Sequence, residues 1–344
     1  MRDTPFSLTN EQRAAILERL FKLLQDHYVF PDVAKNVEET LQQRLNAGDY
    51  DEFTTADVFC ELITEHMYEI SQDRHLSLLF RADRQPLYEG KNLYNDPEWL
   101  KTFRQEAILQ NFGFQRVERL AGNIGYLDLR SFFPPEFAGD TAVAVMTFLA
   151  HTSALIIDLR YNDGGENYMA HLLSSYFFEG EPLLLNSFYL RPLQSTHQCW
   201  TLPYVPGKRY VDKPVYVLTG AQTASAAEEF AYTLQQLKRA TIVGARTMGA
   251  ANPIEHYQIT SHVAAYIPMG HAINAITGTN WEGTGVIPER EVPEATALKV
   301  AHLEAVQNVL DTLKEKTSSE AYKVFEKETR LLIKGLLSNE QKQV

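Results

Sequence analysis

Two continuous apolar runs limit the folds that are open to this chain. Residues 154–160 (ALIIDLR) and 215–219 (VYVLT) have the length and character of strands that are buried on both faces. Each run is followed by glycine or other small residues and then by a helical pattern, at residues 166–177 and 224–237. This repeated order of strand, small-residue turn and helix predicts an α/β fold whose functional turns lie at the carboxyl ends of the strands.

The first seventy residues have a different pattern, which predicts helices. Thr9 and Gln12 form a capping-box pair, and the apolar residues that follow, up to Leu24, recur at helical spacing. Two further helices are expected at residues 32–46 and 55–70. After Ser71 the sequence HLSLLF alternates as a strand does, so a second part of the protein begins there.

These patterns predict a domain organisation for the 344 residues. It comprises an N-terminal helical domain at 1–72, a connecting strand and mixed segment at 73–115, a core at 116–316, and a charged helical tail at 317–344. Within the core we expect short strands over 241–290 and an amphipathic helix over 292–315.

Composition and charge exclude several classes of function. The net charge of −12 repels phosphate backbones, so nucleic acid is not expected as a partner. Two cysteines supply no zinc-ligand spacing, and we expect neither a metal nor a cofactor. No apolar run has the length of a membrane span, and the first residues do not resemble a signal peptide. We therefore expect a cytoplasmic protein, or an exported one if a leader was removed.

The sequence LTGAQTASAAEEFAY places Ser225 between two alanines at the start of a predicted helix. Small neighbours let a substrate approach, and the free N–H groups and dipole of a helix N-terminus stabilise negative charge. These features favour a nucleophilic serine. A serine that only caps the helix would show the same pattern.

A second motif, DLRYNDGGE, places Asn162, Asp163, Gly164 and Gly165 after a buried strand. Paired glycines can aim backbone N–H groups at a ligand, which would suit half of an oxyanion hole. An ordinary turn that needs positive φ is the alternative.

A base and a supporting acid are also present. His75 lies in DRHL at the head of the first strand, and imidazole is well suited to accept a serine proton near neutrality, although ten histidines compete for that role. Glu282 lies beside Trp281 in GTNWEGTGV, where a carboxylate could be held against an apolar ring, or could simply be a solvated turn acid.

In chain order, these motifs resemble the tail-specific, or C-terminal processing, protease family. The most similar branch contains tricorn protease and the interphotoreceptor retinoid-binding proteins. DRHLSLLF, DLRYNDGG, TASAAEEF and GHAINAITGTNWEGTGV each resemble a motif of that branch. The resemblance implies a core of the ClpP/crotonase type, built from ββα units and preceded by a helical domain. No segment resembles a PDZ domain.

The resemblance also implies roles for individual residues. Ser225 would be the nucleophile, His75 its base, and Glu282 the carboxylate that supports the imidazole. Gly165 and Ala226 would offer backbone N–H groups to the tetrahedral oxyanion, while Gly164 shapes the loop.

One branch of the family uses a lysine, 25 positions after the serine, as its base. In this sequence that position is Ala250, and no lysine occurs between Arg239 and Leu298. This difference favours the tricorn-like arrangement over a Ser-Lys dyad.

Three hypotheses for function follow. The first is a serine peptidase that hydrolyses peptides or protein tails through an acyl-enzyme. The second is a non-catalytic binding protein for hydrophobic small molecules such as retinoids or fatty acids, whose cleft would be lined by aromatic side chains (Tyr161, Tyr168, Phe177, Phe178 and Trp281). The third is an acyl-transfer enzyme of the same fold. The sequence leaves the oligomeric state open.

Overall fold

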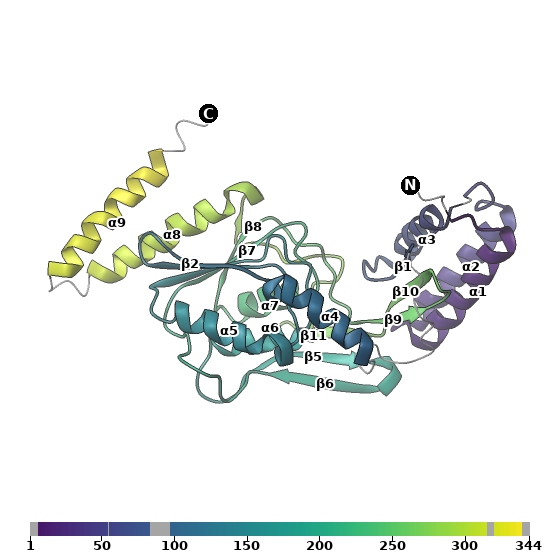
Figure 1. The fold of residues 1–344 in the computed structure, drawn as a ribbon, viewed down its shortest axis with the longest axis horizontal. Helices are drawn as coiled ribbons and strands as arrows, with labels where there is room; N and C mark the ends of the chain where they lie inside the picture. Colours follow the sequence, from purple (N-terminus) through teal and green to yellow (C-terminus); the bar gives the residue numbers. More distant parts are fainter. Residues whose placement is uncertain (1–5, 54, 83–96, 315–319, 339–344) are drawn as a thin grey trace. The chain divides into compact units, whose positions relative to one another are not determined.

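The computed structural model describes residues 6–53, 55–82, 97–314 and 320–338 (Figure 1). The chain divides into two compact units, each built from separate stretches of sequence. Unit 1 comprises Met1–Thr102, Ser187–Gln198 and Ala250–Ile273, and unit 2 comprises Phe103–Asn186, Cys199–Gly249 and Asn274–Val344.

Unit 1 combines three helices with a small antiparallel sheet. The helices are α1 (Asn10–His27), α2 (Pro31–Ala47) and α3 (Ala56–Ser71), and the sheet has the order β1 (Ser77–Phe80), β10 (Val263–Pro268), β9 (Ile254–Gln258). Apolar side chains of the helices and of β1 and β10 share one core. The predicted capping box at Thr9 and Gln12 is present, and it starts α1.

A second three-stranded sheet contains three of the five points where the chain passes from one unit to the other. Its order is β11 (Gly270–Asn274), β5 (Leu184–Leu190), β6 (Ser195–Trp200). These three points fall within β5, β6 and β11, and the other two fall within α4 (Pro97–Leu109) and between Gly249 and Ala250.

Unit 2 is organised around a six-stranded sheet. Its order is β12 (Arg290–Glu291), β8 (Thr241–Gly244), β7 (Val215–Thr219), β4 (Ala154–Asp158), β3 (Ile124–Leu129), β2 (Phe114–Leu120). All neighbouring pairs are parallel except β2 with β3. The two apolar runs of the sequence form β4 and β7, and every residue of both strands is buried.

Helices cover both faces of this sheet (Figure 1). On one face, α8 (Glu294–Lys314) packs its small side chains against β3, β4, β7 and β8, and α9 (Glu320–Ser338) lies on α8. The other helices of this unit are α5 (Pro135–Leu149), which contacts β2 and β3, α6 (Asn167–Ser175), and α7 (Ala226–Gln236), which contacts α6 and β8. The turns that precede α6 and α7 therefore follow the carboxyl ends of the adjacent strands β4 and β7.

The predicted fold class is confirmed: the chain is α/β with an N-terminal helical region. One helix was not predicted, α4 (Pro97–Leu109), because it lies in the polar stretch before the core. The two compact units differ from the contiguous domains that the sequence predicted, because residues 187–198 and 250–273 belong to unit 1. Parts of the predicted connecting segment (83–96) and of the tail (317–319 and 339–344) lie outside the described residues.

No helix in the described parts of the chain combines the length and the apolar character that a membrane crossing requires.

A buried ion pair closes the carboxyl end of β4. Arg160 donates from Nε to Oδ1 of Asp158 at 2.9 Å and from Nη2 to Oδ2 at 2.7 Å, and its Nη1 donates to the carbonyl of Glu294. The hydroxyl of Tyr126 also donates to Asp158, at 2.8 Å. The guanidinium thereby neutralises a buried carboxylate and joins the end of the strand to the start of α8.

We predict that Arg160→Met lowers the free energy of unfolding by about 3–5 kcal/mol, because it leaves the charge of Asp158 buried without its partner. Urea unfolding measures this loss. The matched control is Arg330→Met, which removes an exposed ion pair with Glu326 on α9 and should cost about 1 kcal/mol or less. Equal losses in the two variants would contradict the prediction.

Candidate active site

Ser225 lies at the turn between β7 and α7, at the N-cap position of the helix. Its backbone has φ 54° and ψ −123°, a positive φ that costs a non-glycine residue about 1–3 kcal/mol. Its neighbours Ala224 and Ala226 are buried, whereas Ser225 is only partly buried. The strained turn thus places a serine where a substrate can reach it.

The carboxylate of Glu228 holds this turn in place. Glu228 is fully buried, and its Oε2 accepts a hydrogen bond of 3.0 Å from the backbone N–H of Ser225. Its Oε1 accepts one of 2.7 Å from the N–H of Gly249 and another from the hydroxyl of Thr247. Thr247 in turn accepts from the N–H of Val286 at 2.6 Å. One side chain therefore connects the serine turn to the loop after β8.

Asn162 connects the same turn to the glycine loop. Its Oδ1 accepts from the N–H of Gly164 at 2.8 Å, and its Nδ2 donates to the carbonyl of Leu129 at 3.0 Å. Its own carbonyl accepts from the N–H of Ala224 at 3.1 Å. Asn162 is fully buried, so these bonds fix the loop after β4 relative to Ser225.

Both glycines of this loop occupy conformations and spaces that exclude a side chain. Gly164 has φ +108°, and a Cβ added to it would lie 2.7 Å from the Cβ of Ser225. Gly165 has φ +122°, and its added Cβ would lie 2.2 Å from the carbonyl oxygen of Phe132. The loop therefore packs directly against the serine.

Two backbone N–H groups, one in the glycine loop and one in the serine turn, could serve as donors. Asn162 accepts the N–H of Gly164, whereas within the described residues no acceptor is recorded for the N–H of Gly165 or of Ala226. Backbone donors next to a hydroxyl can stabilise an oxyanion that forms when the hydroxyl attacks a carbonyl.

Glu282 belongs to the same unit and is linked to the serine turn through Gly249. The N–H of the next residue, Gly283, donates to the carbonyl of Gly249 at 2.9 Å, and the N–H of Glu282 donates to Oδ1 of Asn280 at 2.9 Å. Trp281 beside it is buried. Glu282 itself is partly buried.

His75 belongs to unit 1 and lies in the turn between α3 and β1. Burial lowers the pKa of its imidazole, while the charge of Asp73 and a hydrogen bond from the ring to the backbone carbonyl of Asn252 offset part of that effect. A lowered pKa keeps the ring neutral at pH 7, as a general base requires. Ser225 and His75 lie in different units, so their pairing stays a prediction.

A second imidazole and carboxylate pair was not found from the sequence. Nε2 of His171 on α6 lies 2.7 Å from Oε1 of Glu229 on α7, and both side chains are buried. Burial alone would lower the pKa of His171, but the charge of Glu229 and hydrogen bonds with Cys199 and Glu229 raise it to about 10. His171 is therefore protonated at neutral pH and unsuited to act as a base.

The aromatic side chains suggested for a ligand cleft do not form one group. Phe177 and Trp281 are buried in the core, whereas Tyr161 and Tyr168 are exposed. The ring of Tyr161 lies against the guanidinium of Arg130, at 4.6 Å.

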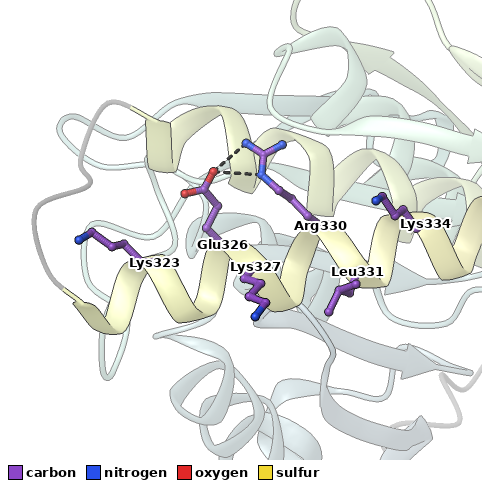
Figure 2. Close-up of a pocket in the computed structure, with 6 residues that line it drawn as sticks. All are labelled: Lys323, Glu326, Lys327, Arg330, Leu331 and Lys334. Atoms are coloured by element: carbon purple, nitrogen blue, oxygen red, sulfur yellow. Dashed lines mark hydrogen bonds and ion pairs between the residues drawn. The ribbon is translucent and has the colours of Figure 1, made fainter.

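Figure 2 shows a hollow on α9 whose six lining residues all come from that helix: Lys323, Glu326, Lys327, Arg330, Leu331 and Lys334. Arg330 pairs there with Glu326 at 2.7 Å. None of the predicted site residues lies in this hollow.

The chain belongs to peptidase family S41. Its sequence matches that family over residues 123–292, and it matches the N-terminal domain of S41 peptidases in eukaryotic IRBP over residues 8–107. These matches confirm the family that the four motifs predicted.

The chain is also similar to individual known proteins. The chain is 28% identical over 194 residues to the carboxy-terminal-processing protease of Bartonella bacilliformis, a match that covers 51% of this chain and 41% of that protein. A candidate peptidase of Parabacteroides merdae has the same fold, with a TM-score of 0.60, 18% identity, and coverage of 89% of this chain and 99% of that one. Tricorn protease gives a TM-score of 0.53 at 12% identity, over 88% of this chain and 37% of its own.

We predict that Gly164→Ala destabilises the protein more than Gly180→Ala does. Both glycines have positive φ, at +108° and +87°, but an added Cβ meets nothing within 4 Å at Gly180. The control should lose about 1–2 kcal/mol for the backbone conformation. Gly164→Ala should lose about 1–3 kcal/mol more, because its methyl group overlaps Ser225. Urea unfolding of both variants measures the difference, and equal losses would show that the loop does not press on the serine.

We also predict that the free energy of unfolding decreases as the pH rises from about 7 to 10. The pKa of His171 is about 10 in the folded protein against 6.5 for an ordinary histidine, so its pairing with Glu229 stabilises the fold fully below pH 6.5 and is lost as the pH approaches 10. Urea unfolding across this range measures the slope. His171→Gln should flatten it, and an unchanged slope in that variant would contradict the assignment.

Proposed function

We propose that the protein is a serine peptidase that hydrolyses peptides or protein tails through an acyl-enzyme. Ser225 is the nucleophile, His75 the base, and Glu282 a carboxylate that supports the imidazole. The observation that carries the proposal is the strained turn of Ser225, against which the glycine loop packs at Gly164. Membership of peptidase family S41 supports it.

In the proposed reaction, the imidazole of His75 takes the proton of the Ser225 hydroxyl while Oγ bonds to the scissile carbonyl carbon. The carbonyl oxygen becomes an oxyanion that accepts from the N–H groups of Gly165 and Ala226. The carbon–nitrogen bond then breaks, the imidazolium gives its proton to the leaving amine, and an acyl-serine remains. Water, deprotonated by the same imidazole, hydrolyses that ester and restores the serine.

Lys213 and Lys238, the first lysines before and after Ser225 in the sequence, lie away from it, which supports a histidine rather than a lysine as base. Lys213 precedes β7, so it lies at the opposite end of that strand from Ser225, and its Nζ donates to the carbonyl of Ala150 at 2.7 Å. Lys238 follows the carboxyl end of α7, so the length of that helix, about 16 Å, separates it from Ser225.

Chain connectivity supports the pairing of Ser225 with His75. Glu228 accepts hydrogen bonds from the N–H groups of Ser225 and Gly249. Asn252 comes three residues after Gly249 and donates to Asp73, which lies two residues before His75. Three residues span at most about 11 Å. The chain therefore passes from the loop that Glu228 binds to the residue that binds Asp73 within a few residues.

The test is covalent labelling with a fluorophosphonate, whose phosphorus bonds to an activated serine oxygen as fluoride leaves. We expect mass spectrometry to locate the label on Ser225. Labelling should disappear in Ser225→Ala and slow by about 100-fold or more in His75→Ala, because a general base contributes about that factor.

The control for the second variant is His197→Ala, which removes an exposed histidine of β6 and should label at the wild-type rate. Folded wild-type protein that remains unlabelled would refute the proposed activity and favour the binding-protein hypothesis. A wild-type rate in His75→Ala would remove His75 from its role as base.

A further inference from the structure

A carboxylate that the roles above do not use lies two residues before His75. Asp73 is only 2% exposed, and one of its oxygens lies within 4.8 Å of a ring nitrogen of His75. Both residues belong to unit 1, in the turn that joins α3 to β1.

Three donors from three segments hold this carboxylate. Its Oδ1 accepts from the N–H of His75 at 3.1 Å, and its Oδ2 accepts from Nδ2 of Asn252 at 3.0 Å and from the hydroxyl of Tyr28 at 3.2 Å. An ionised carboxylate accepts such bonds and donates none, so the surroundings suit a fixed negative charge. The charge is thus held at a defined place beside the imidazole.

Asp73 acts on His75 without a competing charge from its neighbours in the turn. Among the described residues of unit 1, it is the negative charge of Asp73 that raises the pKa of the ring, and it thereby favours the protonated form. Arg74 lies between the two residues in the sequence. Its guanidinium lies over the ring of Tyr68, 4.7 Å from the ring centre.

We propose that Asp73 is a positioning residue for His75: it orients the imidazole and stabilises the positive charge that the ring gains when it takes the proton of Ser225. This role rests on the proposed function. It is separate from that of Glu282, which lies in unit 2. When the imidazolium passes its proton to the leaving amine, the ring becomes neutral again and Asp73 stays ionised throughout.

The first test measures the titration of His75 directly and needs no turnover. Histidine-selective isotope labelling and NMR give the pKa of each imidazole, and the His75 signal is assigned by its loss in His75→Gln. Asp73→Asn should lower the pKa of His75 by about one pH unit or more, because it removes an opposite charge at close range. The control Asp57→Asn, at an exposed carboxylate of α3, should leave it unchanged.

A second variant shifts the titration in the opposite direction. Tyr28→Phe removes one donor from Asp73 and leaves the carboxylate, so more of its negative charge is available to the imidazole and the pKa of His75 should rise. If Asp73→Asn does not fold, the pKa of His75 in Tyr28→Phe alone tests the role of Asp73. A rise supports the proposal, whereas an unchanged or lowered pKa overturns it.

The fluorophosphonate reaction supplies the kinetic readout. In Asp73→Asn the acid limb of the labelling rate should move to lower pH along with the pKa of His75, and the plateau rate should fall by about tenfold or more. A merely structural role would lower the rate without moving the limb. Wild-type protein that is not labelled refutes the proposed function, whereas an unchanged His75 titration in Asp73→Asn overturns the role of Asp73 alone.

Discussion

The buried carboxylate of Glu228 holds the backbone of Ser225 in a conformation that the residue would not adopt by itself. A positive φ at a serine costs about 1–3 kcal/mol, so other contacts must over-determine it. Glu228 supplies them by binding the N–H of Ser225 with one oxygen and the Thr247 and Gly249 donors with the other. Since the charge is fully buried, losing any of these donors is expensive, and the turn is rigid before a substrate arrives.

Ser225 and His75 have surroundings of different kinds. In unit 2 the environment of Ser225 consists mainly of backbone groups, held by the side chains of Asn162 and Glu228. In unit 1 the environment of His75 consists of side chains, with Asp73 held by Tyr28 and Asn252. A nucleophile needs fixed donors around a developing oxyanion, whereas a base needs a tuned proton affinity. The surroundings of Ser225 and of His75 therefore match the role proposed for each residue.

Periodicity and local motifs explain which features the sequence could predict. The apolar runs at 154–160 and 215–219 became β4 and β7, and the Thr9 capping box became the start of α1, because each is encoded by neighbouring residues. The contacts that sequence reasoning missed join distant positions. Glu228 and Gly249 are 21 residues apart, His171 and Glu229 are 58 apart, and Asp73 and Asn252 are 179 apart. The four motifs located the serine and glycine loops, but their spacing carried no signal for the side chains that hold them.

The donors that surround Ser225 are main-chain groups, and this affects how the site can vary. Every amino acid except proline carries an amide hydrogen, so an exchange of side chain at Ala226 leaves its donor intact. Ala226 is buried, however, and its methyl group leaves little room for growth. Substitutions at Ala226 are therefore restricted by the volume of the side chain and not by loss of a hydrogen-bond donor. Replacing the backbone amide of this residue with an ester would remove the donor and keep the side chain unchanged.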